Sequence, residues 1–231
     1  MKKYLLSILA LSTLLLGSCE KESEGLTGTT YYPILEIEGE TTIFIDKGGS
    51  FVEPGYSAVL NGADVTDQVV VLNNADYEKS GIYTVKYVIT NADGFSASAS
   101  RQIIVLDPND AVEGIYVVDP TSYRDYKGNI VNYGRPFEFL VFNKGEYYQF
   151  TDIFAGWYAQ RAGYGSNYEM KANVSLDAEG NMTLLASYIQ GWGDSCDGMG
   201  ADSKYNFDTH TFTYNVDYAS LMTFNVTATR K

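Results

Sequence analysis

Short runs of alternating apolar and polar residues occupy most of the chain from residue 33 onward. The clearest run is 82–90, in which every odd-numbered position is aromatic or aliphatic. Because successive side chains of a strand point to opposite faces, this run predicts a strand with one buried face. The residues expected on that face are Tyr83, Val85, Tyr87 and Ile89.

Turn-forming residues separate the runs between 34 and 106 at intervals of roughly 8–12 residues, which is typical of an antiparallel β-sandwich. Asn61 and Gly62 form a hairpin signal, because both tolerate the positive φ of a two-residue turn. A second turn is predicted at 91–94, after which residues 95–105 return beside the strand at 82–90.

A second group of strand-like runs follows a short linker that contains Pro108. The predicted strands are 112–118, 137–142, 147–151, 168–176, 182–187, 211–216 and 222–229. No stretch shows a helical period over more than two turns. About seven or eight antiparallel strands predict a small barrel or a second sandwich, since closing or doubling a sheet protects its edges. The fold class is therefore all-β.

The first residues have the pattern of a secretion signal. Lys2 and Lys3 precede an apolar run at 4–16, too short for a stable membrane-spanning helix but suited to a signal peptide. The run ends in Leu-Gly-Ser-Cys at 16–19, which resembles the lipobox of bacterial lipoproteins. The resemblance implies cleavage before Cys19, its acylation (palmitate included) and membrane attachment. An ordinary secretory signal with a chance cysteine is the alternative.

The tract Glu-Lys-Glu-Ser-Glu at 20–24 resembles the surface-export signal of lipoproteins in the Bacteroidetes. It implies a lipid-anchored protein of the outer membrane that faces the cell exterior. A plain solvated tether is the alternative, because charged and small residues need no other reason in such a segment.

The charge balance excludes one class of partner. The chain has 16 Lys+Arg and 29 Asp+Glu, so its formal net charge is −13. Removing Lys2 and Lys3 with the signal peptide gives 14 − 29 = −15. Nucleic acid is not an expected partner, because phosphate binding needs clustered Lys and Arg. With one His and two Cys, the chain offers no metal-binding cluster or disulfide framework, and we expect no metal and no cofactor.

Five segments in the first half together resemble the bacterial surface immunoglobulin-like module. They are 51–56, 64–69, 80–87, 93–97 and 101–105, in that order. Glu53 stands where the module usually has Asp, a mild departure. The resemblance implies an immunoglobulin-like β-sandwich that acts as a spacer or platform.

The expected organisation has five parts. They are a lipoprotein signal peptide (1–18), a lipidated flexible tether (19–32), an immunoglobulin-like domain (33–106), a linker (107–111) and a β-rich barrel or sandwich domain (112–231).

Two glycine-rich loops, 152–168 and 188–200, carry both tryptophans of the chain. An aromatic ring covers the apolar face of a pyranose, and neighbouring polar side chains bind its hydroxyls. The candidate ligand-binding residues are Trp157, Tyr158, Arg161, Tyr164, Trp192 and Asp194. The alternative is that both tryptophans plug the ends of the barrel and the glycines only permit tight turns.

The layout as a whole, with the loop segments 156–165 and 191–193, resembles a family of two-domain surface lipoproteins from gut Bacteroidetes. Its members place an immunoglobulin-like domain before a β-rich domain. The resemblance implies a setting beside outer-membrane glycan-uptake systems of the starch-utilisation type, whose proteins are then possible partners.

Catalytic motifs are weak. His210 lies in a turn-and-strand segment, and Ser195 lacks a nucleophile elbow. Cys196 could act as a nucleophile if a base lay close to it, but we expect a buried or idle thiol. We therefore expect no enzyme, although a pair of carboxylates for glycoside hydrolysis stays open among so many acids.

Three functions compete. The leading one is a non-catalytic, glycan-binding or accessory component of a polysaccharide-uptake system. The second is a structural or assembly subunit that binds a partner protein. The third is a carrier of lipid or another small hydrophobic ligand, which requires a barrel with an open apolar interior.

Overall fold

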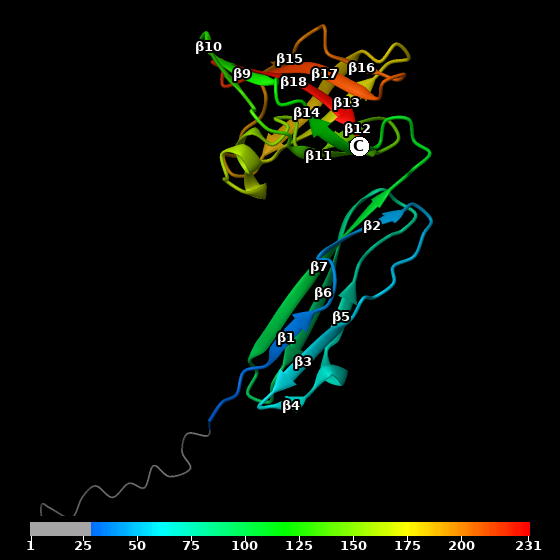
Figure 1. The fold of residues 1–231 in the computed structure, drawn as a ribbon, viewed down its shortest axis with the longest axis vertical. Coiled ribbons are helices and arrows are strands. Elements are labelled where there is room, and N and C mark those ends of the chain that lie inside the picture. Colours follow the sequence, from blue (N-terminus) through cyan, green and yellow to red (C-terminus); the bar gives the residue numbers. More distant parts are fainter. Residues whose placement is uncertain (1–28) are drawn as a thin grey trace, which may run out of the picture.

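The computed structural model describes residues 29–231, so the predicted signal peptide, Cys19 and most of the tether lie outside the described residues. Two β domains follow one another along the chain (Figure 1). The all-β prediction is confirmed, because strands account for nearly all regular structure and the helices are short turns. None of the helices in residues 29–231 has the length and apolar composition needed to span a bilayer.

The first domain contains two sheets. One has the order β1–β3–β4, and the other has the order β2–β7–β6–β5, in which only β2 and β7 are parallel. The strands are β1 (Ile34–Ile37), β2 (Thr42–Asp46), β3 (Tyr56–Leu60), β4 (Ala63–Asp64), β5 (Val70–Asn73), β6 (Gly81–Thr90) and β7 (Ser96–Leu106). Asn61 and Gly62 connect β3 to β4 with φ of 49° and 77°, which confirms the predicted tight turn.

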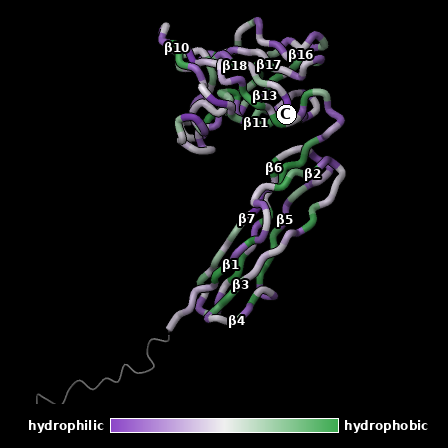
Figure 2. Tube along the Cα trace, in the orientation of Figure 1, coloured by the Kyte–Doolittle hydropathy of each residue, from purple (hydrophilic) through white to green (hydrophobic). Residues whose placement is uncertain are grey.

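The alternation predicted for 82–90 is also confirmed. In β6, Val85, Tyr87 and Ile89 are buried and Tyr83 is half-buried, whereas Thr84 and Lys86 are exposed. The strand pairs with β7 along its whole length, from Gly81 opposite Val105 to Thr90 opposite Ser96. Figure 2 shows the apolar residues that gather along these two strands.

A fully buried arginine ties the segments of this domain together. The Arg101 guanidinium donates to the carbonyl oxygens of Glu38 (2.9 Å), Gly55 (3.1 Å) and Glu40 and to the Glu53 carboxylate (3.2 Å). Its Nε donates to the Tyr87 hydroxyl at 3.1 Å, and this hydroxyl donates to Glu53. The Glu53 carboxylate therefore completes a polar network that satisfies a charge inside the sandwich.

The second domain is an eleven-stranded antiparallel sheet that curls into a half-barrel. Its strands are β8 (Gly114–Val118), β9 (Tyr123–Tyr126), β10 (Asn129–Asn132), β11 (Glu138–Asn143), β12 (Tyr148–Phe150), β13 (Met170–Leu176), β14 (Met182–Ile189), β15 (Gly198–Met199), β16 (Lys204–Asn206), β17 (Thr211–Tyr218) and β18 (Met222–Arg230). All seven predicted strands are present. The strands β9, β10, β15 and β16 were not predicted, because they are short and largely polar.

The curl brings the beginning of β14 close to β16. The Met182 N–H donates to the Ser203 carbonyl at 2.9 Å, and the Tyr205 N–H donates to the Gly180 carbonyl at 2.7 Å. The main path of the sheet nevertheless ends at β10 and at β14, so the sheet does not close along its whole length.

Aromatic side chains fill the interior of the half-barrel. The buried rings include Tyr116, Phe139, Phe150, Tyr205, Phe212 and Tyr214. Their centroids lie 4.5–6.4 Å apart in a continuous series of contacts. The third function considered above, a carrier of a hydrophobic ligand, requires an open apolar interior. Within the described residues, packed aromatic rings occupy this interior, which argues against a carrier.

The loop after β12 is fixed by a buried carboxylate. Asp152 accepts hydrogen bonds from the backbone N–H groups of Phe154 (2.9 Å), Gly156 (2.9 Å) and Met170 (3.1 Å). Burial raises the pKa of Asp152 to about 7, although the three N–H donors act in the opposite direction. The carboxylate therefore orders this loop at the cost of its own desolvation.

Tyrosine hydroxyls satisfy the carbonyl groups of the same loop. Tyr133 donates to the Phe154 carbonyl at 2.7 Å, and Tyr214 donates to the Ile153 carbonyl at 3.0 Å. Gly156 follows with a φ of 85°, and a Cβ there would lie 2.8 Å from the Phe137 Cβ. The loop backbone is thus locked into the end of the half-barrel.

Replacing Arg101 by leucine is expected to lower the free energy of unfolding of the first domain by about 2–4 kcal/mol, because buried oxygen acceptors lose their donor. Amide exchange and circular dichroism during urea denaturation measure this transition. Both tryptophans lie in the second domain, so the fluorescence transition should not move. Lys86→Ala, an exposed change in the same sheet, is the control. Equal stability of the two variants would contradict the inference.

The stability of the second domain should fall as pH rises from about 4 to 7. The pKa of Asp152 is about 7 in the folded state and 3.8 ordinarily, so the folded state favours the protonated carboxyl group. The stability that this provides is complete below pH 3.8 and is lost as the pH rises to about 7 and above. The expected loss is about 3–4 kcal/mol. Asp152→Asn should flatten this dependence in urea denaturation followed by tryptophan fluorescence. An unchanged slope in the variant would assign the effect to other groups.

Candidate functional site

The two tryptophans of the chain have opposite environments. Trp157 begins a π-helical turn, η2 (Trp157–Arg161), and is only 3% exposed. The guanidinium groups of Arg124 and Arg161 lie 4.9 and 4.3 Å from its ring centre. Tyr133 and Phe224 meet its ring edge to face, at 4.9 and 5.9 Å. Trp157 is therefore a core residue. The prediction that it contacts a ligand is wrong, because neighbouring side chains cover its ring.

Arg161 belongs to the same side of the loop as Trp157. Its guanidinium lies over the Trp157 ring, and its Nε donates to the Tyr133 carbonyl at 3.2 Å. Through these contacts Arg161 stabilises the loop, and it does not belong to the group of aromatic residues around Trp192.

Trp192 is 42% exposed and lies among four tyrosines, and we call these five residues the aromatic patch. They are Tyr158, Tyr164, Tyr168, Trp192 and Tyr218. Tyr158 and Tyr168 meet the Trp192 ring edge to face at 4.7 and 5.0 Å. Tyr218 stacks with it at 6.2 Å and an interplanar angle of 24°.

The patch has a buried layer and an exposed layer. Tyr158 and Tyr218 are buried beneath it, and Tyr158 also contacts the core rings of Phe154 and Phe224. Tyr164, 55% exposed, and Trp192 form the outer layer, while Tyr168 is half-buried. The exposed rings therefore rest on the hydrophobic core of the domain.

A backbone contact joins the two glycine-rich loops. The Gly191 N–H donates to the Asn167 carbonyl at 2.7 Å. A Cβ at Gly191 would lie 2.5 Å from Cε1 of Tyr168, so only glycine permits this approach. The contact places Trp192 beside Tyr168.

Asp194 supplies a carboxylate beside the patch. Its carboxylate accepts the Ser195 N–H at 2.7 Å, and its carbonyl accepts the Ile189 N–H at 2.9 Å. Burial, followed by the negative charge of Asp194, raises the pKa of the Tyr218 phenol. The structure therefore brings together four of the six candidate residues, namely Tyr158, Tyr164, Trp192 and Asp194, and leaves Trp157 and Arg161 apart.

Sequence reasoning missed two members of the patch. Tyr168 is the last residue of the first glycine-rich loop, so its position in that loop could have identified it as a candidate. Tyr218 lies at the end of β17, and only the folded sheet brings it under Trp192.

The residues considered for catalysis lie in unfavourable surroundings. Burial raises the pKa of the Cys196 thiol to about 12, so the thiol is protonated at neutral pH and is a poor nucleophile. His210 Nδ1 lies 3.1 Å from the Tyr205 hydroxyl and 3.3 Å from the Ala111 carbonyl. Within residues 29–231, no group of three or more His, Cys, Asp or Glu is arranged to hold a metal ion.

Two family models divide the chain. Residues 35–105 match the bacterial surface protein Ig-like domain, and residues 106–230 match a family described as a C-terminal domain. No curated protein matches the chain.

The solved structures that are similar to the chain include the following three. Two contain CBM51 domains of ZmpB from Clostridium perfringens, one of them in complex with GlcNAc. Both are 18% identical, with TM-scores of 0.27 and 0.28, and they cover 85% and 87% of this chain but 43% and 21% of their own. Such low scores carry no argument.

The third is the crystal structure of the lipoprotein BT2262 from Bacteroides thetaiotaomicron. It is 35% identical, has a TM-score of 0.71, and covers 86% of this chain and 100% of its own. The resemblance to two-domain surface lipoproteins is thereby confirmed, and the chain belongs to the family of lipoprotein BT2262, with an immunoglobulin-like domain before a β-rich C-terminal domain.

Proposed function

We propose that this protein is a non-catalytic surface lipoprotein that binds glycan through the aromatic patch. The observation that carries the proposal is the position of Trp192, a large exposed ring supported by Tyr158, Tyr168 and Tyr218. Leaving so large a ring in water is unfavourable, and a sugar that covers it recovers part of this free energy.

The surroundings of Trp192 suit a saccharide. The exposed side chain of Asn167 comes directly before Tyr168 in the sequence, and those of Gln190 and Asp194 lie on either side of Trp192. They offer hydrogen-bond donors and acceptors for the hydroxyl groups of a sugar. Tyr158 packs on Phe154 and Phe224 and in turn contacts Trp192, so little side-chain entropy is lost when a ligand binds.

The absence of catalysis is part of the proposal. The Cys196 thiol is held in its protonated form, and the contacts of His210 are with Tyr205 and Ala111 rather than with the aromatic patch. These surroundings favour a binding protein over a hydrolase.

The proposed setting is the outer face of the outer membrane, where Cys19 carries the lipid and uptake proteins are the partners. Three observations support it: the lipobox-like segment at 16–19, the acidic tract at 20–24, and a family member that is itself a lipoprotein. The immunoglobulin-like domain would then hold the patch away from the membrane surface.

One observation favours the second candidate, a subunit that binds a partner protein. The edge strand β5 exposes the side chains of Val70, Val71 and Leu72. An uncharged apolar edge is a template for strand pairing with another chain. This candidate becomes the stronger one if no glycan binds.

Trp192→Ala is expected to weaken glycan binding about fivefold or more, because a central aromatic residue of a binding surface contributes about 1–3 kcal/mol. The measurement is affinity electrophoresis and a glycan array with residues 20–231. Tyr188→Ala removes an exposed ring outside the patch and is the matched control. Trp157→Ala should instead lower the free energy of unfolding by about 3–5 kcal/mol.

Two results contradict this assignment. One is a glycan affinity that Trp192→Ala and Tyr188→Ala reduce equally. The other is a large loss of stability in Trp192→Ala, which would make Trp192 a core residue like Trp157.

Cys19→Ser is expected to abolish fatty-acid labelling and to release the protein from the membrane fraction, whereas Cys196→Ser leaves both unchanged. Antibody binding to intact cells then tests the outer face. Replacing 20–24 by alanines should remove the surface signal but keep the lipid. Labelling of Cys19→Ser, or surface display without the acidic tract, would contradict the anchor or the export signal respectively.

A further inference from the structure

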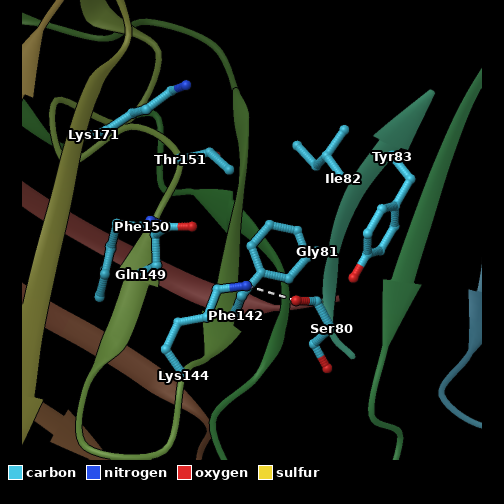
Figure 3. A pocket seen from close by; sticks show the side chains of 10 residues that line it. All are labelled: Ser80, Gly81, Ile82, Tyr83, Phe142, Lys144, Gln149, Phe150, Thr151 and Lys171. Atoms are coloured by element: carbon cyan, nitrogen blue, oxygen red, sulfur yellow. Dashed lines mark hydrogen bonds between the residues drawn. The ribbon is translucent and has the colours of Figure 1, made fainter. Parts of the chain in front are cut away.

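A second candidate site lies at the junction of the two domains. It is a pocket of about 300 Å³, and none of the residues that line it belongs to the aromatic patch. The first domain contributes Ser80, Gly81, Ile82 and Tyr83, and the second contributes Phe142, Lys144, Gln149, Phe150, Thr151 and Lys171 (Figure 3). Small-molecule sites have volumes of about 300–1,000 Å³, so this pocket is at the small end of that range and has room for a ligand of monosaccharide size.

Strand register explains which side chains face the pocket. Val141, Phe150 and Ala172 stand opposite one another across β11, β12 and β13, and all three are in the core. Their neighbours therefore point to the outer face of the sheet. Phe142 and Gln149 are such neighbours, and so is Lys171.

The ammonium group of Lys144 is fixed at the pocket. Its Nζ donates to the Ser80 carbonyl at 2.6 Å and lies 5.2 Å from the centre of the Phe142 ring. An ammonium has three N–H donors, so two remain for a ligand. Partial burial lowers the pKa of Lys144, while attraction to Glu113 opposes this effect. A bound anion would relieve that cost.

Lys171 adds a second positive charge, and the pocket lining contains no carboxylate. The four ion pairs found within residues 29–231 involve Lys47, Lys79, Arg101 and Lys231, so neither pocket lysine is paired there. Burial raises the pKa of Glu169, whereas attraction to Lys171 lowers it, and Glu169 lies outside the pocket lining. Two unpaired lysines facing one pocket are notable in a chain of net charge −13.

We propose that this pocket binds a sugar that carries an anionic group, a carboxylate or a sulfate, which pairs with Lys144. Lys171, which lies apart from Lys144 in the same lining, attracts this negative charge into the pocket. The Gln149 amide and the Thr151 hydroxyl are placed for the sugar hydroxyls, and Ile82 offers an apolar surface. That the ligand is a saccharide rests on the proposed function, whereas its negative charge rests on the two lysines alone.

Binding would also couple the domains. The ligand contacts the segment 80–83 of the first domain and β12 and β13 of the second, beside the Lys144–Ser80 hydrogen bond that already connects them. An occupied pocket therefore favours one arrangement of the two domains.

Isothermal titration of residues 20–231 with glucuronate, glucose 6-sulfate and glucose tests the proposal. Glucuronate or glucose 6-sulfate should bind at least about tenfold more tightly than glucose, and the preferred one identifies the anionic group. Lys144→Gln and Lys171→Gln should each weaken this binding about tenfold, and added salt should weaken it as well. Lys204→Gln, an exposed lysine outside the pocket, should have no effect. Unchanged melting temperatures show that the variants are folded.

The proposal is overturned if neither anion binds, if glucose binds equally well, or if the two lysine variants bind like the wild type. Loss of binding in Trp192→Ala would also overturn it, because the sugar would then occupy the aromatic patch. If glucuronate binds through the lysines but no polysaccharide binds the chain, the pocket stands and the proposed function fails.

Discussion

The buried Asp152 carboxylate holds the loop on which the proposed site depends. Three backbone N–H groups converge on it, and two tyrosine hydroxyls bind the neighbouring carbonyl oxygens. The loop therefore enters the end of the half-barrel with its polar groups satisfied, as burial requires. Because η2 lies in this loop directly after the residues that Asp152 holds, the same contacts set the position of Tyr158, which supports Trp192.

Aromatic residues serve two purposes in this domain, and their surroundings decide between them. Inside the curled sheet, rings pack edge to face and replace an open cavity. At the loop end, the series of rings continues outward until Trp192 and Tyr164 reach solvent. Glycine at 191 permits the close contact that joins the two loops. The exposed rings are thus the outer edge of the core, which explains how a loop surface is kept rigid.

Period-two alternation was sufficient to predict the long strands β6, β17 and β18, because each of them buries one face. The short polar strands β9 and β10 carry no such signal. Local sequence could not distinguish Trp157 from Trp192, since both lie in glycine-rich loops and only tertiary contacts with Arg124 and Arg161 cover the first. For the same reason, Tyr218 and the lysine pair of the domain junction were not predicted: each depends on residues that are distant in sequence.

Because the chain has only two tryptophans, the two indole N–H signals in a ¹H–¹⁵N spectrum test the central claim directly. The signals are assigned with Trp157→Phe and Trp192→Phe, and a glycan that the protein binds is titrated into the wild type. A surface site around Trp192 predicts that the Trp192 signal shifts with saturation while the Trp157 signal stays in place. Saturable binding that leaves the Trp192 signal unmoved, or that shifts only the Trp157 signal, would contradict the account.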